Sequence, residues 1–297
     1  MIRSTDWMRY RGDGRTPAGD TALTRGEPGR YLADDALVTA VNTALAVEQP
    51  LLVTGEAGTG KTMLAWSIAA ELGLGPVLDF HTRSDHQARD TLYDVDHLLR
   101  FYHAQTGDAR AGDMESYVRW QALGEAIRSP VQRVVLIDEV DKAPRDFPND
   151  LLDEIDRMEF RVPELGQSFA ATTRPIVIVT SNSERQLPDP FLRRCIFHRI
   201  AFPDAGRLRA ILHERLRHLR VADRLVDVAV DRFEQLRGLA GWEKHPSTAE
   251  LLAWVRVLVA AGVDPDALDR TPLAALPFRG ALAKTEQDQL VFERAAD

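Results

Sequence analysis

The sequence contains a single cysteine, Cys195, and no long apolar run. One thiol cannot form a disulfide within the chain, which is typical of proteins from reducing compartments, so we expect a cytoplasmic location. No segment approaches the roughly 20 consecutive apolar residues that a membrane-spanning helix requires. The polar, Gly- and Arg-rich residues 1–15 also lack the apolar core of a secretory signal. We therefore expect neither a disulfide framework nor a membrane span.

The chain also lacks an excess of positive charge. Its 37 lysines and arginines face 45 aspartates and glutamates, which gives a formal net charge of −8. Nucleic-acid binding depends on cationic side chains that neutralise phosphates, so this balance disfavours nucleic acid as a partner, although it leaves room for a local basic channel. Four histidines match no metal-ligand spacing, and we expect them at the surface or satisfied by hydrogen bonds: His81, His86, His97 and His103.

The 297 residues are enough for two compact units, and three stretches differ in pattern. Residues 1–29 are rich in Gly and Pro among charges, which predicts a flexible leader. Residues 30–203 alternate short apolar runs with helical patterns, which predicts an α/β unit around a mostly parallel sheet. Residues 204–297 show helical patterns only and predict a helical domain.

Within the α/β unit, short β-branched runs predict buried strands at 51–54, 77–80, 134–137, 176–179 and, less regularly, 200–202. Apolar residues at helical spacing predict helices at 34–47, 62–72, 84–104, 119–128 and 149–158. In the last stretch the same spacing predicts helices at 208–219, 225–236, 247–260 and 281–295.

Residues 55–62 fit the phosphate-loop pattern G-x-x-x-x-G-K-[ST], between a predicted buried strand and a predicted helix. Glycines there let backbone N–H groups surround phosphate oxygens, and the helix presents its positive N-terminus to the same anion. Lys61 should reach the β- and γ-phosphates of ATP, and Thr62 should ligate Mg²⁺. The expected loop consists of Gly55, Glu56, Ala57, Gly58, Thr59, Gly60, Lys61 and Thr62.

Two carboxylates, Asp138 and Glu139, directly follow the apolar run 134–137. In phosphate-loop proteins such an Asp holds Mg²⁺, and the adjacent Glu can polarise the attacking water. Asn182 follows the next apolar run along the chain, and its amide would orient the same water if the two strands are neighbours. We expect Asp141 to be a turn or capping residue.

Two adjacent arginines, Arg193 and Arg194, end a segment whose Pro188-Asp189-Pro190 start is typical of a short helix. The permanently charged guanidinium suits a phosphate that gains charge in the transition state, and a neighbouring subunit can supply it. We assign this role to Arg194, with Arg193 as the alternative and a surface ion pair as the plainer reading of both.

Together these motifs resemble the AAA+ ATPases, in whose terms they correspond to Walker A, Walker B, sensor 1 and the arginine finger. The chain is most similar to the MoxR-like members of that family. Three runs carry the closer resemblance: PLLVTGE at 50–56, IDEVDKAPRDFPNDLL at 137–152 and TSNSER at 180–185. The resemblance covers residues 30–297 and leaves the first 29 outside it.

The resemblance implies a P-loop NTPase fold with a parallel αβα core at 30–203 and an all-helical lid at 204–297. It implies a hexameric ring with ATP and Mg²⁺ at each interface. It also implies a chaperone-like ATPase that remodels or activates a partner protein, often one with a von Willebrand factor A domain. A β-hairpin expected before the sensor 1 strand fits residues 160–174, with Gly166 in the turn.

The lid of the family usually carries a sensor 2 arginine at a helix start, whereas residues 243–250 read EKHPSTAE. Lys244 is the nearest cation and our candidate to touch the γ-phosphate, with a plain surface lysine as the alternative. Tyr31 and Leu32 lie where the family packs against adenine, and a helix-start staple would explain them equally well.

Three other functions stay open at this point. A DNA- or RNA-dependent motor shares the motifs, although the acidic charge disfavours it. A nucleotide-dependent switch, for example in a defence system, would bind ATP with negligible turnover. A small-molecule kinase is the third. The arrangement of Asn182 and the arginines disfavours it, because such a kinase does not need these residues.

Overall fold

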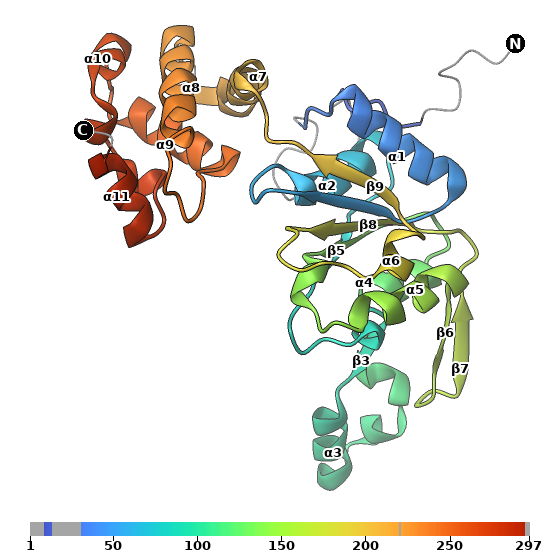
Figure 1. The fold of residues 1–297 in the computed structure, drawn as a ribbon. Coiled ribbons are helices and arrows are strands. Elements are labelled where there is room, and N and C mark those ends of the chain that lie inside the picture. Colours follow the sequence, from blue (N-terminus) through green and yellow to red (C-terminus); the bar gives the residue numbers. More distant parts are fainter. Residues whose placement is uncertain (1–8, 14–30, 220, 295–297) are drawn as a thin grey trace, which may run out of the picture. The chain divides into compact units, whose positions relative to one another are not determined.

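The computed structural model describes residues 9–13, 31–219 and 221–294. The chain divides into two compact units (Figure 1). The first comprises Met1–Gly55 and Gly60–Ile200, and the second comprises Glu56–Thr59 and Ala201–Asp297.

A five-stranded parallel sheet forms the centre of the first unit, in the order β2-β5-β8-β1-β9. Its middle strands are runs of β-branched and leucine side chains that are buried on both faces, as parallel sheets require. The predicted parallel α/β core is thereby confirmed. The strands are β1 (Leu51–Gly55), β2 (Leu78–His81), β5 (Val134–Asp138), β8 (Ile176–Ser181) and β9 (Ile196–Ile200).

Helices cover both faces of this sheet, because successive strand residues point to opposite sides. On one face Leu51, Val53 and Leu136 pack with α1 (Asp35–Val47) and α2 (Lys61–Leu72). The other face packs against α4 (Ala122–Arg128) and α5 (Phe147–Arg157). A short α6 (Asp189–Leu192) precedes β9.

The structure departs from the sequence prediction between β2 and α4. The expected helix 84–104 is instead η2 (Ala88–Thr91), β3 (Tyr93–Val95) and α3 (His97–Thr106). The chain then continues through η3 (Ala109–Gly112) and η4 (Met114–Tyr117) into β4 (Val118–Trp120), which pairs antiparallel with β3. The expected helix 119–128 was therefore wrong at its start, because Arg119 and Trp120 belong to this ladder.

Two further strands form the predicted hairpin, which is confirmed. They are β6 (Glu159–Val162) and β7 (Gln167–Ala170), paired antiparallel. Gly166 in the turn has a φ of 66°, a conformation that glycine adopts without the steric penalty of a Cβ atom.

Residues 9–13, which the sequence placed in a flexible leader, pack onto the first unit. The Tyr10 ring is fully buried among α1 and α2 side chains, and its hydroxyl shares a 2.9 Å hydrogen bond with Ser67 Oγ. The Tyr10 N–H donates to Asn42 Oδ1, and Asn42 Nδ2 donates back to the Tyr10 carbonyl. The leader prediction is wrong for this segment; the remainder of residues 1–29 lies outside the described residues.

The second unit is helical, and no strand occurs in its described residues. Its core surrounds the fully buried Trp254 and Phe233. The expected strand 200–202 was wrong, because β9 ends at Ile200. The helices are α7 (Ala205–Leu216), η6 (Arg217–Leu219), α8 (Asp223–Arg237), α9 (Thr248–Ala260), α10 (Pro265–Arg270), η7 (Leu273–Ala275), η8 (Arg279–Ala281) and α11 (Glu286–Arg294). Among the described helices of the chain, none is long and apolar enough to cross a bilayer.

Candidate functional site

The polar residues singled out in the sequence meet at one edge of the sheet, where parallel strands deliver their carboxyl ends. β1 leads into the phosphate loop, β5 ends at Asp138, and β8 ends at Ser181, directly before Asn182. Because β8 lies between β5 and β1, these three ends are adjacent. Ligands in open parallel sheets bind in this position.

The phosphate loop has the backbone of an anion cradle. Gly58 and Gly60 have φ angles of 73° and 92°, and Gly60 is the N-cap of α2, so the helix N-terminus faces the loop. The buried Lys61 ammonium donates to the Gly55 carbonyl at 2.8 Å, which holds the side chain across the loop. A Cβ on Gly60 would approach the Tyr31 ring to 3.1 Å, so Tyr31 lies against this loop. The next residue, Leu32, is half-buried.

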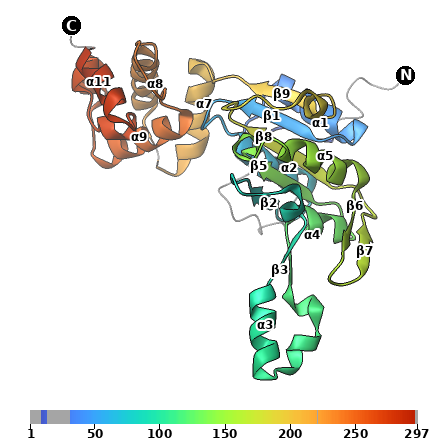
Figure 2. The same cartoon turned by 60° about the horizontal axis from the view of Figure 1, so that its bottom comes forward.

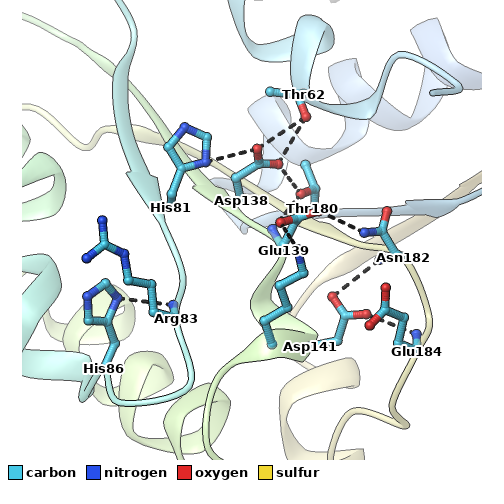
Figure 3. A network of polar contacts seen from close by, with 11 residues as sticks. Thr62, His81, Arg83, His86, Asp138, Glu139, Asp141, Thr180, Asn182 and Glu184 are labelled. Carbon is cyan, nitrogen blue, oxygen red and sulfur yellow. Dashed lines mark hydrogen bonds and ion pairs between the residues drawn. The ribbon is translucent and has the colours of Figure 1, made fainter. Parts of the chain in front are cut away.

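Thr62 and Asp138 face each other across the site (Figure 3). The Thr62 hydroxyl lies 3.1 Å and 3.3 Å from the two carboxylate oxygens of Asp138. Thr180, fully buried on β8, donates to Asp138 Oδ1 at 2.5 Å and accepts the Glu139 N–H at 2.9 Å. A hydroxyl and a carboxylate supply the hard oxygen ligands that Mg²⁺ prefers, so these residues fit the ion.

Glu139 adopts a left-handed backbone conformation, with φ 58° and ψ 50°, at the start of η5 (Val140–Lys142). Its carboxylate accepts from Asn182 Nδ2 at 2.9 Å and from Lys142 Nζ at 2.5 Å. Partial burial raises the pKa of Glu139, but the hydrogen bonds from Lys142 and Asn182 outweigh burial and leave the pKa below its ordinary value. Glu139 is therefore ionised at neutral pH and held at two points.

Asp141 is buried and acts as a capping residue. Its carboxylate accepts the backbone N–H groups of Asn182, at 3.3 Å, and Glu184, at 3.0 Å (Figure 3). These contacts fix the turn that follows β8 and so the position of the Asn182 amide.

His81, expected at the surface or satisfied by hydrogen bonds, has a partly exposed side chain with carboxylate partners, one of which is Asp138 at the site. It ends β2, in register with Asp138, and its Nδ1 lies 3.3 Å from the Asp138 carboxylate (Figure 3). Its Nε2 lies 3.3 Å from the Asp79 carboxylate. The signal that could have revealed it is its place at the end of a predicted strand. Using that signal requires knowing that β2 neighbours β5.

The two arginines follow α6 rather than lying within it, with Arg193 as its C-cap. Arg194 Nη1 lies 3.3 Å from Asp156 on α5. Arg193 is exposed and, in the part of the chain that the structure describes, has no ion-pair partner.

In the second unit Lys244 is exposed, and its backbone N–H donates to the buried Asp288 carboxylate at 3.2 Å. Residues 56–59 of the phosphate loop also group with this unit, where the Arg237 guanidinium pairs with Glu56 and stacks on Phe202. No motif in the sequence indicates a role for Arg237.

Comparison with known families matches residues 51–204 to the ATPase family associated with various cellular activities (AAA). Comparison with curated proteins finds no match. Among solved structures, a single-residue variant of Thermotoga maritima RuvB is similar over 78% of this chain, at 15% identity and a TM-score of 0.51. The Thermotoga maritima RuvB Holliday junction branch migration motor is similar over the same share, at 16% identity and a TM-score of 0.48.

The chain spans slightly less than two thirds of these solved chains, 66% and 64% of their lengths. At such low identity the likeness concerns the fold. It agrees with the predicted fold class, which is confirmed as a parallel core of the P-loop AAA+ type, followed along the chain by a helical region.

Proposed function

Because the chain belongs to the AAA family of ATPases, we propose that it binds and hydrolyses Mg-ATP at a subunit interface of a ring. The energy released would remodel or activate a partner protein, as in the MoxR-like members. The observation that carries the proposal is the meeting of Thr62, Asp138, Glu139 and Asn182 at the edge of the sheet beside the phosphate loop.

In the proposed complex, residues 55–62 surround the phosphates and the Lys61 ammonium turns from the Gly55 carbonyl to the β- and γ-phosphates. Thr62 and Asp138 hold Mg²⁺, which neutralises charge on the phosphates when it is bound. Tyr31, beside Gly60, and Leu32 are placed by the proposal near adenine.

Glu139 is the proposed general base and Asn182 its partner in orienting water. The carboxylate accepts from both Asn182 and Lys142, one donor on each oxygen, and the second lone pair of either oxygen would accept from the attacking water. The lowered pKa keeps Glu139 unprotonated and able to accept the proton of that water.

The proposed finger is Arg194 and, alternatively, Arg193, reaching the ATP of the neighbouring subunit. The Asp156 pair gives Arg194 a fixed starting position, whereas Arg193 is exposed. In the ring, which AAA+ proteins commonly form and which we propose to be hexameric, each site would then contain residues of two subunits. Lys244 is proposed as the lid residue that senses the γ-phosphate.

The MoxR-like assignment rests on three sequence runs, 50–56, 137–152 and 180–185. Within the second run, Lys142 and Asp141 make hydrogen bonds at the candidate site. It makes a protein with a von Willebrand factor A domain the expected partner. The β6–β7 hairpin is the proposed element that faces the pore or this partner.

Phosphate release by wild type and Glu139→Gln tests the proposal. We expect Glu139→Gln to bind ATP as tightly as wild type but to turn over about 10²–10⁴-fold more slowly, because only the base is lost. Lys61→Ala should lose nucleotide binding. Glu159→Gln, an exposed carboxylate on the hairpin, serves as the matched control and should resemble wild type. Equal, near-zero rates for wild type and Glu139→Gln would instead support a nucleotide-dependent switch.

A further inference from the structure

Residues 93–120, here called the arm, carry α3 away from the sheet (Figures 1 and 2). The outward face of α3 is apolar: Leu98 is 79% exposed, Phe101 60% and Tyr102 61%. These residues follow the i, i+3, i+4 spacing of one helix face. Amphipathic surface helices normally turn such a face toward the core, whereas α3 turns its apolar face toward solvent.

The patch is not a chance scatter of surface side chains. Of the eleven large hydrophobic residues that are exposed in the described chain, four lie on α3, including Leu99 at 40%. The others, such as Val47, Val131 and Phe197, lie on separate elements. Isolated exposed apolar residues are ordinary, whereas a contiguous group marks an interaction surface.

The arm is internally fixed, which keeps the apolar face outward. Asp96 caps α3 by accepting the Leu99 N–H at 2.9 Å and pairs with Arg119 at 2.6 Å. On the opposite side of the helix, the buried His103 Nδ1 shares a 2.8 Å hydrogen bond with the Tyr117 hydroxyl. Rotating α3 to hide Phe101 and Tyr102 would break these contacts.

Charge argues against two kinds of occupant. The arm has five carboxylates and three arginines, and two of those arginines are already paired with carboxylates. The whole chain also carries a net charge of −8. An anionic membrane surface or a nucleic acid is bound through an excess of cationic side chains, which the arm does not have, whereas another apolar protein face can pack on α3 without one.

Size argues for a second copy of this chain. A stable complex between free proteins usually buries about 800 Å² on each partner, more than one face of a ten-residue helix offers. Such a small face binds well only when its partner is already held nearby at high effective concentration. The ring of the proposed function supplies that condition, since neighbouring subunits are held together elsewhere.

We propose that the apolar face of α3 packs against the arm of a neighbouring copy, making the arms a second subunit interface apart from the nucleotide site. The inference depends on the proposed function only for the ring that holds the copies together.

Cysteine cross-linking tests the contact, because Cys195 is the sole natural cysteine and is buried. Tyr102→Cys places a thiol on the apolar face. Ala104→Cys, also exposed, lies two residues on and therefore about 200° around the same helix. With ATP and a flexible bismaleimide, Tyr102→Cys should give cross-linked chains at least several-fold more often than Ala104→Cys. Equal yields in an assembled ring would overturn the proposal.

Self-association of the double variant Leu98→Glu with Phe101→Glu gives a second measure. Sedimentation should show at least about tenfold weaker assembly, since two buried apolar side chains are replaced by charges. Val131→Glu, an exposed apolar site outside the arm, is the control for surface charge, and circular dichroism checks folding of each variant. Unchanged assembly of the double variant would count against the arm contact.

The two proposals fail separately. Cross-linking through Tyr102→Cys in a chain that does not hydrolyse ATP would uphold the arm interface and refute the ATPase proposal. Turnover and ring assembly that persist without any arm cross-link would uphold the ATPase proposal and refute the arm interface.

Discussion

At the scale of single residues, Thr180 links the two carboxylates of the site. Its hydroxyl donates to the side chain of Asp138 and accepts the backbone N–H of Glu139. One buried oxygen therefore sets the orientation of the proposed metal ligand and the backbone of the proposed base.

Thr180→Val keeps the volume and branching of the side chain but removes both hydrogen bonds. We expect a loss of about 1–3 kcal/mol in the free energy of unfolding, because the Glu139 N–H loses its partner and the buried Asp138 carboxylate keeps the Thr62 hydroxyl but loses its shorter hydrogen bond. ATP turnover should fall as well, with nucleotide binding less affected. Denaturant titration and phosphate release measure the two effects. Thr172→Val, at an exposed position, is the control, and equal stability of the two variants would contradict this role.

Cys195 offers a prediction about pH. Burial, with a smaller contribution from the Asp156 carboxylate, raises the pKa of Cys195 to about 12. The thiolate is the reactive form, so the native thiol should label slowly at pH 9, where an unfolded thiol with a pKa of about 8.5 is largely ionised. The rate of maleimide labelling in buffer and in denaturant measures this difference. Similar rates in both would show that Cys195 is accessible.

Much of the candidate site could be predicted from sequence because its residues lie in local motifs. Residues 55–62 are contiguous, and Asp138, Glu139 and Asn182 each follow a recognisable strand. His81 and Lys142 could not be found in this way. The contact of His81 with Asp138 depends on the order of strands in the sheet, and that of Lys142 with Glu139 on a left-handed turn.

At the scale of elements, Gly124 joins α4 to the base of the arm. A Cβ at this position would lie 1.9 Å from the Leu92 carbonyl oxygen, which belongs to the backbone and cannot rotate away. The same carbonyl accepts the Gln121 N–H at 3.0 Å. Helix α4 therefore touches the segment before β3 directly through its backbone.

Gly124→Ala should destabilise the fold, although alanine favours helices. The clash requires α4 and Leu92 to separate, so we expect a loss of about 1–3 kcal/mol, against a gain of up to about 1 kcal/mol at an exposed helix position. Thermal and denaturant unfolding measure the change. Gly112→Ala, where an added Cβ meets nothing within 4 Å, is the control. A stabilised Gly124→Ala variant would refute the close approach.

Helices and strands with a clear repeat or run of apolar residues could be predicted from the sequence. Those whose position depends on tertiary contacts could not. Strands β1, β5 and β8 follow from buried β-branched runs. The segment 84–104 has helical spacing, yet Tyr93 and Val95 pair with β4 and Asp96 starts a new helix. Tyr10 was missed because one aromatic residue in a Gly-rich stretch has no period from which to infer burial.

At the scale of the assembled molecule, the proposed finger makes a distinct prediction about mixed rings. Lys61→Ala and Arg194→Ala should each be inactive alone, and an absent finger slows turnover by about 10³-fold or more in related phosphoryl transfer. Mixed in equal amounts, about a quarter of the interfaces would combine an intact Lys61 with an intact neighbouring Arg194, because ring interfaces are heterologous.

Phosphate release by the mixture should therefore recover to a measurable fraction of wild type. Sedimentation of each variant alone serves as the control for assembly. Absence of recovery in mixtures that do assemble would exclude Arg194 as a residue acting between subunits. The same mixture made with Arg193→Ala then tests the alternative.

The left-handed backbone of Glu139 sets the stability of the fold against the proposed role of its carboxylate as the base. A residue with a Cβ atom in that conformation carries on the order of 1 kcal/mol of strain, which glycine would relieve. Glu139→Gly should thus melt at the same temperature as wild type or higher, while its hydrolysis is abolished. Lower thermal stability of that variant would mean that the Asn182 and Lys142 contacts outweigh the relief. If the glycine variant is the more stable, the glutamate at position 139 lowers the stability of the fold, and its proposed role as the base accounts for its presence there.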